Sequence, residues 1–204
     1  VETSPEPMPE KWVCLTCDDG PSKTTPDVLS ALNSAGVKAT FFVVATGNND
    51  KYLPLISEAA AAGHQIALHS ASHEYSDIYQ SADAYWKDID LLKERLSPYV
   101  RADGLRYLRF PGGSTNTVSR RYGGRGVMAE LKQQCAEKGY AYVDWNVDAQ
   151  PTKEEAFNKL LPRVHPGAIV LLHNTSKTNG EILDELLTKW EEMGYTFKPL
   201  SELK

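Results

Sequence analysis

Short apolar runs alternate with amphipathic helical segments along this chain, and this alternation restricts the fold more than any other feature. The apolar runs are rich in Val, Ile, Leu and aromatic residues, which favour strands. We expect strands at residues 12–17, 38–44, 65–69, 105–110, 141–146, 168–173 and 196–198. Repetition of strand, helix and strand predicts an α/β protein with a parallel sheet and right-handed crossovers. Seven strands fit either a doubly wound sheet or an incomplete barrel.

The segments between these runs have the pattern of helices that cover a sheet. Their apolar residues recur at spacings of three and four, as in Val28 and Leu32. Four of the segments are followed by a glycine at the place where a helix ends in a left-handed residue, namely Gly36, Gly63, Gly139 and Gly194. We expect one domain over residues 12–204, preceded by a Pro- and Glu-rich lead at residues 1–11.

Charge and composition exclude several classes of function. The chain has 22 Lys and Arg against 27 Asp and Glu, a formal charge of −5, so it offers no cationic field for nucleic acid. No apolar run approaches the ~18 residues that cross a bilayer, and we expect no membrane span. The lead lacks the apolar core of a signal peptide, so we expect a processed chain without its targeting segment. Three cysteines are too few for a disulfide framework, and Cys14 and Cys17 are expected to be buried hydrophobes on opposite faces of a strand.

Polar and titratable residues follow several of the predicted strands. They are Asp18 and Asp19, His69 and His73, Arg109, and His173. The carboxyl ends of parallel strands meet at one rim, where α/β proteins bind ligands. A long loop rich in Gly, Ser and Arg, at residues 112–126, follows one of them, and loops of that length are usually functional.

Each of these motifs also has an ordinary structural interpretation. Asp18 and Asp19 precede Gly and Pro and fit a turn with a helix cap. Two histidines four residues apart face each other only on a helix, so His69 and His73 could be unrelated. His173 fits a core histidine with satisfied hydrogen bonds. The conjunction of all of them at one rim favours a functional site over these alternatives.

The residue types indicate a catalytic metal. One carboxylate with two imidazoles is a ligand set typical of catalytic zinc, with a coordination position left for water. A second aspartate can then take a proton from that water. Arg109 is expected to hold this base by a bidentate contact and to lower its pKa, and His173 is placed to act as the acid.

These residues resemble the motifs of the polysaccharide deacetylase family, the NodB-homology domain of carbohydrate esterase family four. TCDDG at 16–20 resembles the first motif, with Cys in place of the usual Phe, and HSASH at 69–73 matches the second. RFPGG at 109–113 resembles the third motif and LLH at 171–173 matches the fifth. The motifs run in the family's order, and the resemblance extends from about residue 13 to residue 203.

The resemblance implies a distorted (β/α) barrel of about seven parallel strands and the removal of acetyl groups from polymeric carbohydrate. It implies a divalent ion, Zn²⁺ with Co²⁺ or Ni²⁺ as alternatives, held by Asp19, His69 and His73. Asp18 would be the general base and Arg109 its partner, with His173 as the general acid.

Substrate contacts are implied in the same way. Pro111 would belong to the loop that lines one wall of the groove. The backbone N–H near Gly112 would help to hold the oxyanion, and Leu171 would contact the acetyl methyl.

The fourth motif departs from the family pattern. Members commonly place an aspartate near the catalytic histidine, where this chain has Pro and Thr at 151–152. Either Asp148 takes over this role or His173 is tuned differently, with reduced activity or activity shifted to acid pH.

The leading hypothesis is a metal-dependent deacetylase of N-acetylated glycan, with bacterial peptidoglycan favoured over chitin oligomers or acetylated xylan. We expect a monomer that acts outside the bacterial cell or on its surface. One alternative is a glycan-binding module of weak or no activity on the same fold, suggested by the missing carboxylate. Another is an intracellular hydrolase of small cyclic amides.

Overall fold

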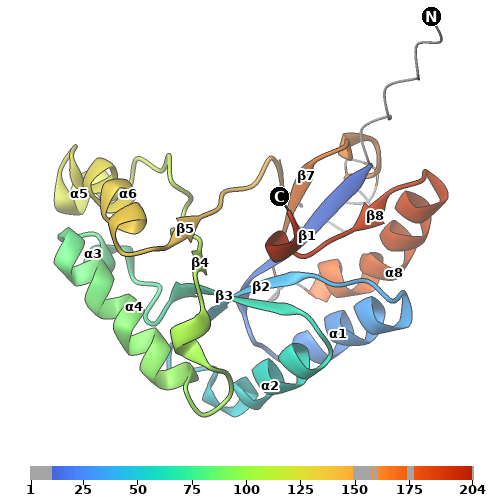
Figure 1. The fold of residues 1–204 in the computed structure, drawn as a ribbon, viewed down its shortest axis with the longest axis horizontal. Helices are drawn as coiled ribbons and strands as arrows, with labels where there is room; N and C mark the ends of the chain where they lie inside the picture. Colours follow the sequence, from blue (N-terminus) through green and yellow to red (C-terminus); the bar gives the residue numbers. More distant parts are fainter. Residues whose placement is uncertain (1–10, 149–157, 159, 174–176, 204) are drawn as a thin grey trace, which may run out of the picture.

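A parallel sheet with helices along its outer side forms the framework of the protein. The computed structural model describes residues 11–148, 158, 160–173 and 177–203. The strands are β1 (Trp12–Gly20), β2 (Thr40–Val44), β3 (Gln65–Ser70), β4 (Tyr107–Leu108), β5 (Ala141–Tyr142), β6 (Val147–Asp148), β7 (Ala168–His173) and β8 (Thr196–Phe197). Their order is β5-β4-β3-β2-β1-β7-β6, and β8 pairs with the start of β1. The expected α/β architecture of about seven parallel strands is confirmed, as an open half-barrel (Figure 1).

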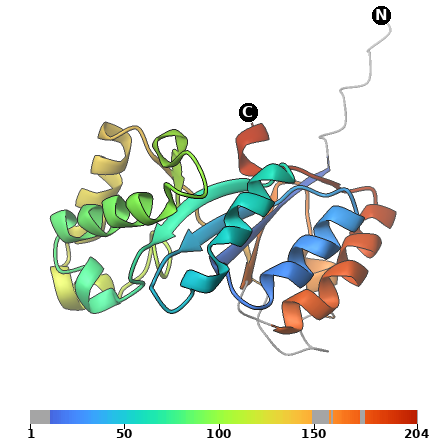
Figure 2. The same ribbon diagram turned by 90° about the horizontal axis from the view of Figure 1, so that it is seen from below.

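Seven α-helices lie in the described part of the chain. They are α1 (Thr25–Ser34), α2 (Pro54–Ala61), α3 (Tyr75–Ile78), α4 (Ala82–Leu96), α5 (Ser119–Gly123), α6 (Val127–Glu137) and α8 (Lys177–Glu192). Figure 2 shows α1 and α8 side by side, with α2 next to α1. All four glycines expected to end helices have positive φ. The short helix α5 interrupts the segment 112–126, which the sequence had suggested was a loop throughout.

The strand predicted at 141–146 is confirmed only at its first two residues, which form β5. The next strand, β6, begins after the predicted segment and lies at the opposite edge of the sheet from β5. Between them the chain crosses the open side of the half-barrel, as the yellow-to-orange trace shows in Figure 1. Backbone hydrogen bonds hold the two ends of the crossing, from the Val143 N–H to the Leu108 carbonyl and from the Asn146 N–H to the Ile169 carbonyl. Between them, Arg109 donates hydrogen bonds to the carbonyls of Val143 and Asp144.

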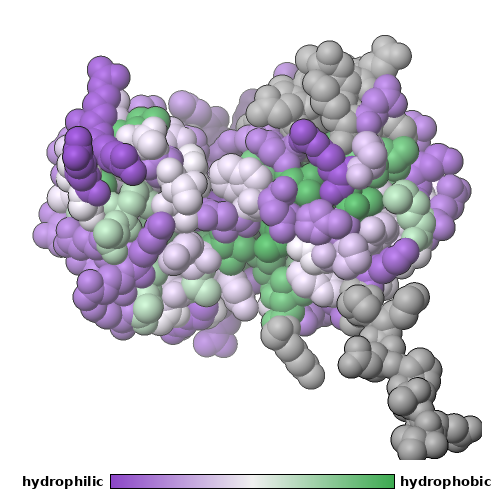
Figure 3. Space-filling model, turned by 90° about the horizontal axis from the view of Figure 1, so that it is seen from above, coloured by the Kyte–Doolittle hydropathy of each residue, from purple (hydrophilic) through white to green (hydrophobic). Residues whose placement is uncertain are grey.

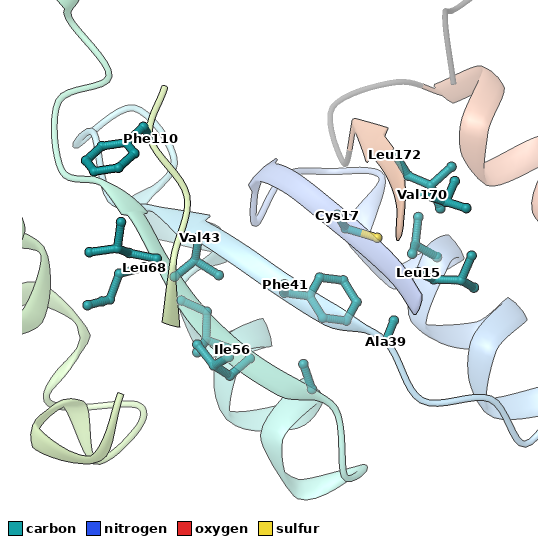
Figure 4. Close-up of a cluster of buried hydrophobic side chains, with 14 of the residues drawn as sticks. Leu15, Cys17, Ala39, Phe41, Val43, Ile56, Leu68, Phe110, Val170 and Leu172 are labelled. Carbon is teal, nitrogen blue, oxygen red and sulfur yellow. The ribbon is translucent and has the colours of Figure 1, made fainter. Parts of the chain in front are cut away.

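The main hydrophobic core lies between the sheet and the helices. Leu15, Phe41 and Leu68 of neighbouring strands belong to this cluster, as does Ile56 of α2 (Figure 4). Cys17 belongs to this cluster, whereas Cys14 belongs to a second cluster on the other face of the sheet. The two cysteines are therefore buried, unpaired and on opposite faces, as expected.

The surface and the helices carry two simpler findings. Seen from above, the molecule is hollowed between two lobes, with hydrophobic surface gathered near the middle (Figure 3). Among the described residues, no helix has the length and apolar character needed to cross a bilayer.

His64 is a buried histidine that serves the fold. Its Nδ1 accepts the Ala39 N–H at 3.1 Å, and its Nε2 lies 3.0 Å from Asn33 Oδ1. The ring is therefore neutral, with its proton on Nε2. Burial, and to a smaller degree Lys38, lowers the pKa of His64 to about 4.

We therefore expect the protein to lose stability as the pH falls from about 6.5 to about 4. In this window the unfolded chain binds a proton at His64 that the folded protein excludes, so the contribution is complete only above the unfolded pKa. Urea unfolding between pH 4.5 and 7.5 measures this slope. The slope should decrease in His64→Gln and stay unchanged in His165→Gln, whose side chain is exposed. Equal slopes in both variants would contradict the assignment.

Two stacked, fully buried tyrosines offer a second test. Tyr79 donates a hydrogen bond of 2.7 Å to the Pro111 carbonyl, whereas the Tyr85 hydroxyl has no partner among the described residues. Because an orphaned buried hydroxyl carries a desolvation cost, Tyr85→Phe should raise the free energy of unfolding by ~1 kcal/mol and Tyr79→Phe should lower it by ~1 kcal/mol. Chemical denaturation distinguishes the two, and destabilisation by both would show that Tyr85 has a partner.

Candidate functional site

The two consecutive aspartates are separated by an irregularity at the end of β1. The register between β1 and β2 shifts between Asp18 and Gly20, and Asp19 has a φ of 65°. Asp18 therefore stays in the strand, paired with His173 of β7, and its side chain is buried. Asp19 is turned out of the ladder and is partly exposed. The two carboxylates can thus have different partners.

The histidines at 69 and 73 meet without a helix between them. His69 is the fifth residue of β3, and His73 lies in the turn that follows, with a φ of 56°. The two rings lie 5.1 Å apart. The expectation that histidines four residues apart need a helix to meet is therefore wrong here, because a left-handed residue in a tight turn has the same effect.

Asp19, His69 and His73 form a group that could hold a metal ion. Asp19 Oδ1 lies 3.3 Å from His69 Nε2 and 3.2 Å from His73 Nε2. Ligands ~2.1 Å from a tetrahedral zinc are roughly 3.4 Å apart, so these spacings fit a shared ion. Asp19 Oδ1 is inaccessible to solvent and accepts no hydrogen bond from the described residues. His69 Nδ1 donates to the Arg109 carbonyl at 2.6 Å, which leaves its Nε2 lone pair free for a metal.

The charges of this group are mutually dependent. Burial opposes ionisation of Asp19, but the surrounding histidines hold its pKa well below the usual range. Burial likewise opposes protonation of His69, but the carboxylates of Asp19 and Asp18 raise its pKa. The group is therefore a strongly polar centre, in which His69 can release a proton when a cation binds.

Arg109 contacts Asp18 through one nitrogen only. Its Nη1 donates to Asp18 Oδ1 and to Thr16 Oγ1, both at 2.8 Å, while Nε and Nη2 donate to the carbonyls of Val143 and Asp144. The expected bidentate contact is therefore wrong, because the other donors hold the crossing chain. Burial raises the pKa of Asp18. His69 and Arg109 lower it, as expected of Arg109, but burial outweighs them and the pKa lies above its ordinary value.

His173 is the last residue of β7 and lies near the carboxylates of Asp19 and Asp148. Its Nδ1 lies 3.6 Å from Asp19 Oδ2, and its Nε2 lies 4.0 Å from Asp148 Oδ1. The neighbouring Asp19 raises the pKa of His173, and burial opposes this effect. Asp148 is thus within reach of His173, while residues 151–152, where the fourth motif departs, lie outside the described part of the chain.

The loop after β4 passes close to the histidines. Gly112 has a φ of 80°, and a Cβ there would lie 3.1 Å from the Tyr75 hydroxyl, whose ring packs edge-on against His73. The Pro111 carbonyl is occupied by Tyr79. Leu171 is buried in β7 and pairs with Asp148. Pro111 and Gly112 thus lie in a loop beside the cluster, and Leu171 is two residues before His173.

Sequence reasoning missed three residues that support this arrangement. Asp144 accepts hydrogen bonds from the Ser114 N–H, at 2.8 Å, and from the Ser114 hydroxyl. Tyr75 covers Gly112, and Asp88 contacts the turn between the two histidines. Asp88 gave a weak signal, as an acidic residue on the apolar stripe of a helix.

Known proteins are similar to this chain in sequence and in fold. Residues 6–125 match the family described as polysaccharide deacetylase. The chain is 35% identical over 199 residues to peptidoglycan-N-acetylmuramic acid deacetylase PdaA of Bacillus subtilis, covering 95% of this chain and 72% of that protein. It is 34% identical to peptidoglycan-N-acetylglucosamine deacetylase PgdA of Listeria monocytogenes, covering 100% of this chain and 41% of that protein.

A solved structure extends the likeness to three dimensions. The catalytic domain of peptidoglycan N-acetylglucosamine deacetylase from Eubacterium rectale superimposes with a TM-score of 0.88 at 34% identity. The match covers 98% of this chain and 91% of that one.

We expect Asp19→Ala and His69→Ala to weaken Zn²⁺ binding by more than ~100-fold. Loss of a ligand should reduce the affinity more than loss of a residue that only hydrogen-bonds to a ligand. Asp18→Asn should retain binding, because Asp18 faces Arg109. Competition with a chromophoric chelator measures the affinities, and His165→Ala, an exposed histidine, is the control. Unchanged affinity in Asp19→Ala would refute the ligand assignment.

Proposed function

We propose, because this chain belongs to the polysaccharide deacetylase family, that it removes N-acetyl groups from bacterial peptidoglycan. Its relatives include deacetylases named for each of the two sugars of peptidoglycan, and their similarity identifies this chain as a glycan deacetylase. We also propose that the protein acts at the cell surface and that it is a monomer. The observation that carries the proposal is the grouping of Asp19, His69 and His73 beside a separate, buried Asp18.

Asp19, His69 and His73 would hold the ion, with Zn²⁺ as our choice for a site of two imidazoles and a carboxylate. The chemistry that a divalent ion would supply when bound by these residues is that of a Lewis acid, which would polarise the acetamide carbonyl and make the attacking water more acidic. The protein itself orients both imidazoles, since Arg109 O fixes the tautomer of His69 and the turn at residues 70–73 fixes His73.

Asp18 is suited to accept the proton of the attacking water. Its Oδ2 lies 4.0 Å from His69 Nε2, so it borders the ligands without being one. Arg109 fixes Oδ1 and leaves Oδ2 toward the site. Because burial raises the pKa of Asp18, the carboxylate is a stronger base than a solvated one.

His173 is suited to protonate the leaving nitrogen. Hydrolysis forms a bond from water oxygen to the acetyl carbon and breaks the bond from that carbon to the sugar nitrogen, which must gain a proton. Asp19 raises the pKa of His173, which favours the protonated ring that an acid requires. Asp148 is the carboxylate that we propose in place of the fourth-motif residue.

The acetyl group would bind between these residues and the loop after β4. We propose that the N–H near Gly112 donates to the developing oxyanion and that Pro111 forms part of the wall of the groove. We propose Leu171 as the apolar contact for the methyl group. These assignments follow from the position of the loop beside the cluster and of Leu171 on β7.

Acetate release from peptidoglycan, chitin oligomers and acetylated xylan tests this function. We expect release from peptidoglycan to stop after chelation and return with Zn²⁺. Asp18→Asn should lower kcat by ~10²–10⁴-fold while Zn²⁺ remains bound, the usual worth of a general base. Asp27→Asn, an exposed change on α1, is the control.

Other outcomes favour the alternatives. Affinity for glycan without acetate release would indicate a binding module. Cleavage of small cyclic amides without action on sugars would indicate an intracellular hydrolase of cyclic amides. No metal-dependent release from any acetylated glycan would refute the proposed function.

A further inference from the structure

A buried carboxylate outside the proposed chemistry contacts the turn between the two histidines. Asp88 lies on α4 and is 9% exposed. Its Oδ2 accepts hydrogen bonds from the Ser70 hydroxyl at 2.6 Å and from the Ala71 N–H at 2.8 Å. Its Oδ1 accepts the Ser72 N–H at 2.9 Å. All three donors belong to the residues between His69 and His73.

Ser70 extends this contact to His73 itself. The hydroxyl that donates to Asp88 also accepts the His73 N–H at 2.8 Å. His73 has a φ of 56°, a conformation that costs a residue with a Cβ roughly 1 kcal/mol or more. Asp88 and Ser70 therefore hold four consecutive residues in a turn that the chain would not adopt by itself.

Stability alone is a poor explanation for this carboxylate. A buried charge has a large desolvation cost, and an apolar residue on the inner face of α4 would avoid it. Within the described residues, no Lys, Arg or His lies within 4.0 Å of the Asp88 oxygens to offset that cost. Its hydrogen-bond partners in the described part of the chain are the three donors of the turn between the histidines, and both carboxylate oxygens accept from them.

We propose that Asp88 is a positioning residue that sets the metal affinity of the site by holding the His69–His73 turn. The inference rests on the proposed metal site. Without Asp88, the turn can relax toward ordinary φ values, which displaces His73 Nε2 from the position 3.2 Å from Asp19 Oδ1. Outer partners that orient ligands typically change metal affinity by ~10–100-fold.

Asp88→Asn is the sharpest test, because it keeps the size of the side chain. An amide has one oxygen, so at least one of the Ala71 and Ser72 N–H groups would face an NH₂ group. We expect the dissociation constant for Zn²⁺, measured on the intact chain by chelator competition, to rise ~10–100-fold. The visible spectrum of the Co²⁺-loaded protein should change as well, since it reports ligand geometry.

The matched control is Asp90→Asn, an exposed change on the same helix, which should leave the dissociation constant and the spectrum unchanged. Thermal unfolding of the metal-free proteins separates positioning from stability. A purely structural role would lower the melting temperature of Asp88→Asn and leave the affinity of the folded protein unchanged. That result would overturn the inference.

If Asp88→Asn fails to fold, Ser70→Ala decides the question. It removes the hydroxyl that joins Asp88 to the His73 N–H and leaves the carboxylate in place. Weaker Zn²⁺ binding and an altered Co²⁺ spectrum would support the inference, and wild-type values would overturn it. Absence of Zn²⁺ binding by the unmodified chain would instead refute the proposed metal site, so the two failures are distinguishable.

Discussion

The buried guanidinium of Arg109 is the contact on which the rest of the site depends. It is completely inaccessible to solvent, lies over the rings of Phe42 and Trp145, and directs its donors in two directions. One set reaches β1 at Thr16 and Asp18, and the other reaches the chain that crosses the open side of the half-barrel. A charge so deeply buried is tolerable only when its donors are satisfied. The position of the Asp18 carboxylate and the path of the chain across the open side of the half-barrel therefore depend on the same side chain.

Four carboxylates around this centre have four different environments. Asp18 is buried in the strand, Asp19 is turned toward histidines by an irregularity in β1, Asp144 holds the loop after β4, and Asp88 holds the histidine turn. Their residue type is the same, and their surroundings differ. Asp144 and Asp88 accept hydrogen bonds from backbone N–H groups. Of these four carboxylates, Asp19 is thus left to bind a cation and Asp18 to take part in proton transfer.

Much of this arrangement was predictable from local patterns. Strand and helix alternation identified β1, β2, β3 and β7 to within a few residues, because long apolar runs and helix-ending glycines are local signals. The gathering of an aspartate with His69 and His73 followed from their places at strand ends, and the family resemblance identified that aspartate as Asp19. The prediction of one strand over 141–146 failed after Tyr142, because the chain leaves the edge of the sheet there and its carbonyls at Val143 and Asp144 accept hydrogen bonds from Arg109, which no local pattern records.

The sequence by itself determined the class of fold, the ligand types and the rim at which they gather, since periodicity and residue chemistry are properties of short segments. Only the tertiary structure decided that Arg109 contacts Asp18 through a single nitrogen, that His73 reaches His69 through a left-handed turn, and that Asp88 holds this turn from α4. Those features depend on backbone conformation at single residues and on contacts between elements far apart in the chain. They are fixed because buried polar groups must form hydrogen bonds, and these bonds form only when the chain is folded.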